Sequence, residues 1–333
     1  MRRANRHAAA MNTERSLVPH LCLAGAVLLW GTSFVAMKYA LTGFAPMAVI
    51  FLRMALASLI MTLFWGRVPR AGRQPGDLKW LGLVCLLQPC LYFLLEGYAV
   101  SLTTSAQAGM VSSLVPLLVA AGAFAFLGEA LSARMVVGLC LSLSGVVWLS
   151  LSGAAGESAP NPALGNFLEL LAMCCASGYM LVLKHLSTRY NSWQLTGLQV
   201  FAGAIFFLPA ALLSSPQWLA DPARALAAVP APAWLAVAYL GGVVTLGAFG
   251  LYNQAVTRLA SAQAAASINL VPLVAVLAGW LLLGEALTPA QLAACGLILC
   301  GVLLGQMKAK AAARPGTADA AQRPDPQPVD ETA

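Results

Sequence analysis

Residues 105–131 read SAQAGMVSSLVPLLVAAGAFAFLGEAL, and residues 261–287 read SAQAAASINLVPLVAVLAGWLLLGEAL. The blocks SAQA, LVPL and LGEAL recur in both stretches at a constant offset of 156 residues, with no gap between them. Three matched blocks in register are not expected by chance, so the chain contains two copies of one unit. Each copy is almost wholly apolar, and an apolar chain with an internal duplication is typical of membrane proteins built from two structural repeats.

The composition indicates the class of protein. Of the 333 residues, 60% are hydrophobic and 9% are charged, whereas a soluble globular chain carries about 25% charged residues. Apolar segments of about 20 residues, the length that crosses a hydrocarbon core, follow one another along most of the chain. The alternation of apolar and polar residues that marks a β-barrel is not seen in the sequence. We therefore predict an all-α integral membrane protein.

Ten transmembrane helices are expected, five in each copy of the unit, separated by short loops with glycine or proline. The first repeat, residues 21–152, contains spans at 21–41, 47–66, 80–100, 105–127 and 134–152; the second, residues 165–307, contains spans at 165–185, 194–214, 233–256, 260–283 and 290–307. Residues 1–20 are an N-terminal tail, 153–164 are a linker, and 308–333 are a tail with too little apolar sequence to fold. The basic start is expected to be uncleaved, and the sequence leaves open whether Met1 or Met11 is the first residue.

The basic residues predict the orientation in the membrane. With the N-terminus in the cytoplasm, sixteen Lys and Arg residues fall in cytoplasmic segments, and Arg224 alone falls in an outer loop. Positive charge is retained on the cytoplasmic side, so both termini are expected there, with the chain in the inner (cytoplasmic) membrane. The net charge of +7 is then explained by contact with an anionic lipid leaflet, and nucleic acid is not expected as a partner.

An odd number of spans in each repeat has a geometric consequence. The second copy must enter the membrane from the opposite side, so the copies form two inverted five-helix repeats related by a pseudo-two-fold axis in the membrane plane. Inverted repeats allow one fold to open to either side by exchanging the conformations of its halves. The sequence therefore favours a secondary transporter of small molecules that works by alternating access.

Several motifs resemble one known family. WGTSFVAMK at 30–38 is similar to the first span, and FLR at 51–53 to the second span, of EamA-type transporters in the drug/metabolite transporter (DMT) superfamily. The duplicated SAQA, LVPL and LGEAL blocks resemble the fourth-to-fifth span regions of both halves, and the resemblance covers about residues 20–307. It implies ten helices in two EamA repeats, with a central cavity lined by the first four helices of each half. It also implies export of small metabolites, amino acids or drugs from the cytoplasm without ATP.

One feature departs from the wider superfamily. Its small four-helix members use an essential Glu in the first span for proton coupling, and residues 21–41 contain no acidic residue. Proton coupling is therefore left open. The substrate, the net direction of transport and the oligomeric state are left open as well.

Charged residues within the spans are the first candidates for a substrate site, because charge in a membrane is costly and therefore rare. Lys38, Arg53 and Glu96 are the candidates in the first repeat, and at an offset of 146 residues Arg53 matches the neutral Gln199. Arg53 and Glu96 are expected at similar depth in the outer half of the membrane. We expect them to flank the outer end of the cavity, where Arg53 meets Glu96 or an anionic substrate group and Glu96 serves a protonation-linked step. The alternative is that they snorkel to the interface, and for Glu169 an interfacial position is preferred.

Uncharged residues complete the candidate substrate site. Trp30 lies in mid-span, away from the interfacial belts where tryptophan usually falls, and either lines the cavity or packs in the core. Gln107, Gln263 and Asn269 are polar residues within spans. They either contact substrate or form hydrogen bonds between helices.

Two matched pairs of residues bear on conformation. Pro116 and Pro272 each remove a backbone donor at equivalent positions, so they are expected to kink helices beside the cavity, with a packing role as the alternative. Glu129 and Glu285 follow a glycine at helix ends and are expected to cap turns or orient loops.

Other classes of protein find less support in the residues. The eight cysteines lie in apolar spans without CxxC spacing, and the three histidines form no ligand pattern, so no metal, disulfide or cofactor is expected. No Walker A motif is present, and His20 and His185 are too shallow for the dyad of an intramembrane protease, so an enzyme is not expected and no catalytic residue is assigned. A passive channel is the main alternative. Saturation and counterflow would mark a carrier, whereas unsaturable conductive flux would mark a channel.

The orientation can be tested with reporter enzymes that are active only outside the cytoplasm. A fusion at residue 310 is expected to be silent and a fusion within residues 153–164 to be active, because the basic loops hold both termini inside. The reverse pattern would contradict the predicted orientation.

Overall fold

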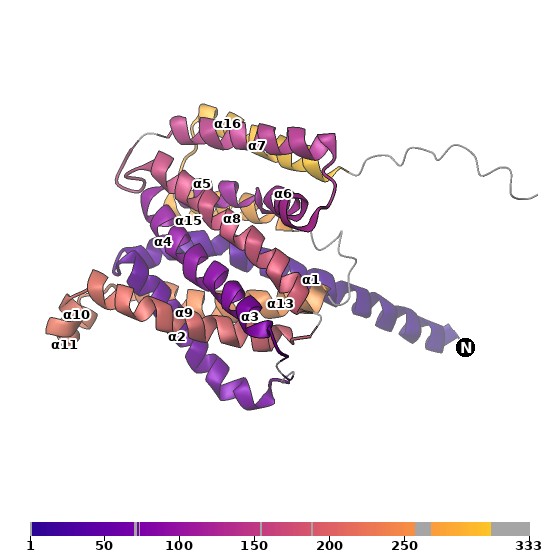
Figure 1. The fold of residues 1–333 in the computed structure, drawn as a ribbon, viewed down its shortest axis with the longest axis horizontal. Helices are drawn as coiled ribbons and strands as arrows, with labels where there is room; N and C mark the ends of the chain where they lie inside the picture. The colour runs from indigo at the N-terminus through magenta and orange to yellow at the C-terminus, as the bar shows by residue number, and fades with distance from the viewer. Residues whose placement is uncertain are drawn as a thin grey trace, which may run out of the picture.

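The computed structural model of the chain is a bundle of long helices (Figure 1). It describes residues 2–69, 72, 74–153, 155–187, 189–256 and 268–307. Within these ranges, nine helical stretches are long and apolar enough to cross a membrane. The expected span at 260–283 is described only in its second part, so the tenth span lies partly outside the described residues.

Helices of the first repeat are α1 (Arg2–Leu41), α2 (Pro46–Phe64) with the short 3-10 turn η1 (Trp65–Arg67), α3 (Asp77–Cys85), η2 (Leu86–Leu91), α4 (Tyr92–Leu102), α5 (Ser105–Ser112), α6 (Val115–Leu127) and α7 (Ala133–Leu151). Helices of the second repeat are α8 (Pro162–Leu186), α9 (Ser192–Ser214), α12 (Ala231–Ala238), η3 (Tyr239–Ala248), α13 (Phe249–Val256), α15 (Val271–Leu283) and α16 (Pro289–Gln306). Two short helices, α10 (Gln217–Ala220) and α11 (Pro222–Ala227), lie in the connection between α9 and α12.

The helix of the first span extends through the N-terminal residues. α1 begins at Arg2 and continues without interruption to Leu41. The alanine-rich stretch at 8–10 favours a helix, and the stretch before Pro19 contains neither glycine nor proline. The C-terminal tail, residues 308–333, lies outside the described residues.

The helices run back and forth between two faces of the molecule. α1 ends at Leu41 on one face, which we name the Leu41 face, and α2 with η1 ends at Arg67 on the other, which we name the Arg67 face. Helices α10 and α11 mark the Leu41 face at the left of Figure 1. The Trp218 ring of α10 packs against the Phe44 ring beside the end of α1, with 5.6 Å between centroids.

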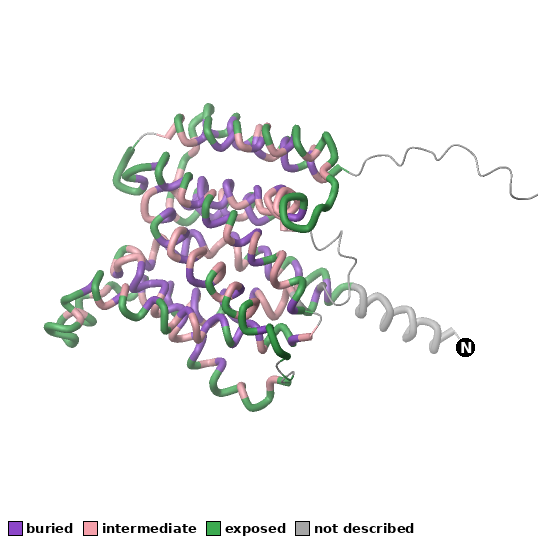
Figure 2. The backbone as a smooth tube through the Cα atoms, in the orientation of Figure 1, coloured by how far each residue is buried: buried purple, intermediate pink, exposed green. Residues whose placement is uncertain are grey.

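The outer surface of the bundle is apolar. Phe126, Leu213 and Leu151 are 84%, 83% and 79% exposed, and exposed positions follow the outward sides of the helices in Figure 2. A contiguous apolar surface of this extent is unstable in water but matches lipid. Together with the nine long apolar helices, it makes the chain a multi-pass membrane protein.

Contacts between α7 and α16, which lie side by side at one edge of the bundle, show how the repeats are related (Figure 1). A methyl group on Gly145 would lie 3.0 Å from the Ile298 nitrogen, and one on Gly301 would lie 2.7 Å from the Ser142 nitrogen. Ile298 and Gly301 are Ser142 and Gly145 shifted by the repeat offset of 156 residues. Each residue thus contacts the repeat equivalent of its partner, which is the signature of a two-fold axis.

The direction of the two helices shows where that axis points. Gly138 of α7 approaches Gly305, whereas Gly145 approaches Ala294, so α7 and α16 run antiparallel. A two-fold axis that relates two antiparallel spans lies across them, in the membrane plane. The prediction of inverted repeats is therefore confirmed.

The two third spans depart from a regular α-helix at equivalent places. In the first repeat the span is interrupted within η2, where Gln88 has non-helical φ and ψ of −146° and 117° and is followed by Pro89. In the second repeat the π-helical segment η3 covers 239–248, which includes 242–247, the residues equivalent to 86–91 at the offset of 156 residues. The Thr245 hydroxyl within η3 donates to the Leu240 carbonyl, 2.7 Å away. π segments are rare and concentrate at functional sites, and the sequence analysis predicted neither departure.

The LGEAL blocks end two helices in the same way. Gly128 after α6 and Gly284 after α15 have positive φ, 70° and 67°, a conformation that glycine adopts without strain. The next amide in each case bonds back six residues, Glu129 to Ala123 and Glu285 to Gly279, at 3.3 and 3.1 Å. This turn needs a left-handed residue at the helix end, which explains why a glycine precedes the glutamate in both copies.

The two prolines at matched positions of the repeats each lie at the start of a helix. Pro116 lies in the first turn of α6, after a turn at 113–114, and Pro272 lies in the first turn of α15, after a turn at 269–270. Proline is tolerated at the start of a helix because its missing N–H needs no partner there. The fourth span is therefore divided into two helices, α5 and α6, rather than bent as one.

The close packing of α7 on α16 is expected to be sensitive to one methyl group. Gly301→Ala should lower the free energy of unfolding by about 1–3 kcal/mol, because its Cβ would overlap the Ser142 and Gly138 backbone. Gly296→Ala is the matched control, since nothing lies within 4 Å of its added methyl group. Thermal unfolding in detergent measures both, and equal midpoints for the two variants would contradict the packing argument.

Candidate functional site

Arg53 lies in the interior of α2 and is 7% exposed. Its Nε donates a hydrogen bond to the Thr245 hydroxyl of η3, 2.8 Å away, and its guanidinium lies over the Phe93 ring of α4, 4.4 Å from the centroid. Among the described residues the guanidinium makes this one hydrogen bond, although it carries five donors. Most of its hydrogen-bonding capacity is therefore free for another acceptor.

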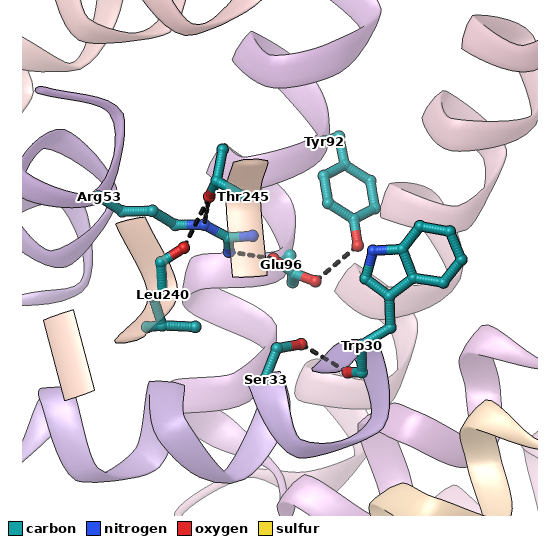
Figure 3. A network of polar contacts seen from close by, with 7 residues as sticks. All are labelled: Trp30, Ser33, Arg53, Tyr92, Glu96, Leu240 and Thr245. Carbon is teal, nitrogen blue, oxygen red and sulfur yellow. Dashed lines mark hydrogen bonds and ion pairs between the residues drawn. The ribbon is translucent and has the colours of Figure 1, made fainter. Parts of the chain in front are cut away.

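Glu96 of α4 is the nearest acidic partner of Arg53. Its Oε2 lies 4.0 Å from the Arg53 Nη1, and its Oε1 accepts a hydrogen bond of 2.6 Å from the Tyr92 hydroxyl. Figure 3 shows the connected chain of contacts from Leu240 and Thr245 through Arg53 to Glu96 and Tyr92. Arg53 and Glu96 thus lie together, as expected from the sequence. They form a long ion pair rather than a close one.

An aromatic group borders the same region. Trp30 of α1 packs against Tyr252 and Phe249 of α13, with centroid separations of 5.2 and 6.0 Å. The Ser33 hydroxyl donates a hydrogen bond to the Trp30 carbonyl, 2.6 Å away, so this contact lies within α1 (Figure 3). Trp30 is half-buried and packs on the second repeat. The Trp30 ring therefore packs against the second repeat, and part of the ring remains exposed.

Glu169 of α8 was expected at the membrane interface, and this expectation is wrong. The side chain is 0% exposed, and neither carboxyl oxygen has a hydrogen-bond partner among the described residues. A methyl group on Gly165, one turn earlier, would lie 2.7 Å from the Thr103 Cβ, so α8 packs tightly along α4. This packing of α8 along α4, the helix that carries Glu96, buries Glu169.

A second pair of contacts repeats the Arg53 arrangement. Gln199 of α9, the repeat equivalent of Arg53, donates through Nε2 to the Gln88 carbonyl of η2, 2.8 Å away. Arg53 of the first repeat thus bonds to η3 of the second, and Gln199 of the second bonds to η2 of the first. Each of the irregular segments η2 and η3 is held by a polar side chain from the second span of the other repeat.

A small cavity lies beside Thr245. Among the described residues it is bounded by Met54, Gln88, Pro89, Phe93, Thr196, Gln199, Val200, Thr245 and Phe249, and its volume is about 20 Å³. That volume holds about one water molecule, whereas sites for small-molecule ligands measure roughly 300–1,000 Å³. A substrate therefore fits in this cavity only after the residues around it move apart.

A larger cavity opens at the Leu41 face. Its volume is about 580 Å³, and Lys38, Glu157 and Glu285 give it charges of both signs. The Lys38 ammonium donates a hydrogen bond to the Ser158 carbonyl. Lys38, a predicted site residue, therefore lies in this cavity and apart from the Arg53–Glu96 pair.

The remaining predicted residues are placed as follows. Gln107 accepts hydrogen bonds from Asn166 and Thr103, at 2.9 and 3.2 Å, so it joins helices as in the alternative that we considered. Asn269 exchanges two hydrogen bonds with Gln306 of α16, at 2.7 and 3.1 Å. Gln263 lies outside the described residues.

Three residues of the site were not predicted: Tyr92, Thr245 and Glu169, the last having been assigned to the interface. Tyr92 carried a usable signal, because it precedes Glu96 by one helical turn and can reach its carboxylate. Thr245 carried none, since it is a neutral residue that bonds to Arg53 across 192 positions of sequence.

The family is shown by comparison with known proteins. The model of the EamA-like transporter family matches residues 17–151 and 163–305, one match for each repeat. The chain belongs to the EamA-like transporter family. It is therefore a secondary transporter, in agreement with the function predicted from the repeats.

Named relatives and a solved structure cover nearly the whole chain. A probable terminal-alkyne amino-acid exporter of Streptantibioticus cattleyicolor is 25% identical, over 84% of this chain and 90% of its own length. A probable amino-acid metabolite efflux pump of Salmonella typhimurium is 27% identical, over 84% and 91%. An S-adenosylmethionine/S-adenosylhomocysteine transporter of Chlamydia muridarum is 28% identical, over 83% and 87%. One crystal structure, 23% identical, covers 86% of this chain and 96% of its own with a TM-score of 0.53, which shows a shared fold.

The Arg53–Glu96 pair can be tested by a double-mutant cycle on stability. Glu96→Gln alone is expected to cost about 3–5 kcal/mol, because it removes the carboxylate that forms the buried ion pair with Arg53. Adding Arg53→Gln should recover much of that loss, since the double variant no longer buries the cation that has lost this partner. Thermal unfolding in detergent gives the coupling, and additive losses would show that the two side chains do not interact.

Proposed function

We propose that this transporter exports small amphoteric solutes of the amino-acid type, and that it binds them at a central cluster formed by Arg53, Glu96 and Glu169. The observation that carries the proposal is a set of opposite charges buried in the interior of the bundle. In the proposed orientation both termini are in the cytoplasm, the Leu41 face is the outer side, and the chain lies in the inner membrane. The support for that orientation is the distribution of Lys and Arg.

The cluster offers complementary partners for both ends of an amino acid. The unused donors of the Arg53 guanidinium match a carboxylate, which a guanidinium binds through two parallel hydrogen bonds. Glu96 and the unpartnered Glu169 match an ammonium group. Phe93 and the half-buried Trp30 provide apolar surface for the side chain of the solute. A singly charged solute would satisfy only one end of this cluster.

The carboxyl pair also suggests how a proton could be coupled to transport. With Arg53 positive, only one of Glu96 and Glu169 is needed as counter-ion, and a second buried anion is unfavourable without a partner. A proton can neutralise the second carboxyl, and so can the ammonium group of a substrate. Competition between the two for one site would make transport an exchange of substrate for a proton.

The names of relatives agree with this class of substrate. Two of the three relatives described above are named as exporters of an amino acid or of amino-acid metabolites. The third is named for S-adenosylmethionine, which is itself an amphoteric molecule with an amino-acid end.

The alternative of a passive channel receives less support. The two inverted repeats provide the geometry for alternating access, which a fixed pore does not use. The relatives described above are named as an exporter, an efflux pump and a transporter.

Counterflow in liposomes tests the proposal. We expect the purified protein to exchange labelled neutral amino acids with saturation, and the rate to differ between acidic and alkaline buffer. Glu169→Gln should slow exchange about tenfold, the factor for about 1.4 kcal/mol, and should remove the pH dependence. The control is Asp221→Asn, which removes an acidic group that caps α11 at the Leu41 face while keeping a capping side chain.

Two results would contradict the proposal. One is exchange by Glu169→Gln at the control rate with an unchanged pH profile. The other is a panel in which cationic or apolar compounds are transported and amino acids are not.

A further inference from the structure

The carboxylate of Glu285 bonds to the other repeat at the Leu41 face. Its Oε1 accepts from the Ser105 amide at 2.9 Å, and its Oε2 accepts from the Ser105 hydroxyl at 2.8 Å and the Ala106 amide at 3.0 Å. Ser105 and Ala106 begin α5 in the first repeat, whereas Glu285 follows the end of α15 in the second. The Glu285 carboxylate therefore accepts three hydrogen bonds from the start of a helix in the opposite half. We name Glu285, Ser105 and Ala106 the Glu285 latch.

The helices behind the latch are fitted closely to it. A methyl group on Gly279 would lie 2.6 Å from the Glu285 Oε2 and 2.7 Å from the Ser105 hydroxyl oxygen, so glycine is required where α15 passes the latch. One turn deeper, Gly109 of α5 lies directly against Ala275 of α15. The two helices leave no room between them from the latch inward.

The latch stands between the outer cavity and the centre. Glu285 lines the cavity of about 580 Å³ at the Leu41 face, together with Lys38. On its other side Ala275 is 0% exposed and packs in the core that also contains Val271 and Phe34. A solute that leaves the centre toward the Leu41 face between α5 and α15 must separate the latch.

We propose that Glu285 closes the outer side of this transporter, and that its carboxylate must release Ser105 and Ala106 each time the protein opens outward. The proposal rests on the alternating access and the orientation of the proposed function. Charge-assisted hydrogen bonds to a helix start are strong, so breaking three of them opposes spontaneous opening. After release, the Glu285 carboxylate still has Lys38 in the same cavity as a counter-ion. This lowers the free energy needed to break the latch in a membrane protein.

The experiment measures access from outside to a position behind the latch. A cysteine replaces Ala275 in a variant whose native cysteines have been replaced and which still transports. Intact cells are then treated with a membrane-impermeant maleimide.

With the latch intact, we expect slow labelling. Glu285→Ala should raise the labelling rate about fivefold or more, the factor that corresponds to about 1 kcal/mol, and Glu285→Gln should fall between the two. Gly279→Ala opens the latch from its other side and should also raise the rate, which keeps the test valid if Glu285→Ala does not fold.

Two matched controls remove a carboxylate without touching the latch. Glu157→Ala removes one from the same cavity, where Glu157 has no hydrogen bond among the described residues. Glu129→Ala removes the equivalent glutamate of the first LGEAL block, which is exposed on the Arg67 face. Neither should raise the labelling rate. An equal rise in either control, or none with Glu285→Ala and Gly279→Ala, would overturn the proposal.

One further position separates this proposal from the orientation on which it rests. Ala228 is exposed in the connection at the Leu41 face, and a cysteine there should be labelled in every variant. If Ala228→Cys is not labelled from outside, the orientation is wrong. If it is labelled while Glu285→Ala leaves Ala275→Cys protected, the orientation stands and the latch proposal fails.

Discussion

Arg53 must find its partners within the protein, because the hydrocarbon around the helices offers none. It lies near the middle of the bundle and draws those partners from both halves: Glu96 from the first repeat, and Thr245 from the second. The contact with Thr245 also engages a π segment, which packs against α2 where Gly241 allows a close approach to the Arg53 carbonyl. Because this one cation needs groups from both repeats, the arrangement of the central helices depends on it.

The symmetry of the two repeats is kept in the backbone and broken in the charges. α7 and α16 meet through equivalent residues, both LGEAL blocks end a helix with a left-handed glycine, and both third spans depart from a regular α-helix at equivalent places. Arg53 and Gln199 are equivalent residues that bond to these irregular segments of the opposite repeat, yet only Arg53 is charged. The backbone therefore retains the geometry that exchange between two states requires, while the charges are not repeated between the halves. The transporter can be symmetric in its motion without being symmetric in its charges.

The features that the sequence predicted correctly are those that depend on local pattern. The duplicated blocks at 105–131 and 261–287 predicted two inverted repeats, and the rarity of charge in the spans singled out Arg53 and Glu96. The burial of Glu169 depends on lateral packing, in which Gly165 lets α8 approach Thr103, and depth counted along one span carries no information on this. Gln107 was a candidate for substrate because it is polar and within a span, but only the neighbouring helix shows that Asn166 occupies it. The positions of the residues that the sequence did not predict are determined by contacts between segments that are far apart in the chain.

The interruption of the third span at Gln88 bears on how the central helices can rearrange. Gln88 has extended φ and ψ, −146° and 117°, between α3 and α4, so the helical ladder of hydrogen bonds is broken there. A single residue at such a break can take up a large change in φ and ψ, whereas a continuous helix has to bend along its length. The part of the span beyond the break is α4, which carries Tyr92 and Glu96. A pivot at Gln88 would therefore swing the carboxylate of the ion pair toward or away from the Arg53 guanidinium, while α4 itself stays helical and within the membrane.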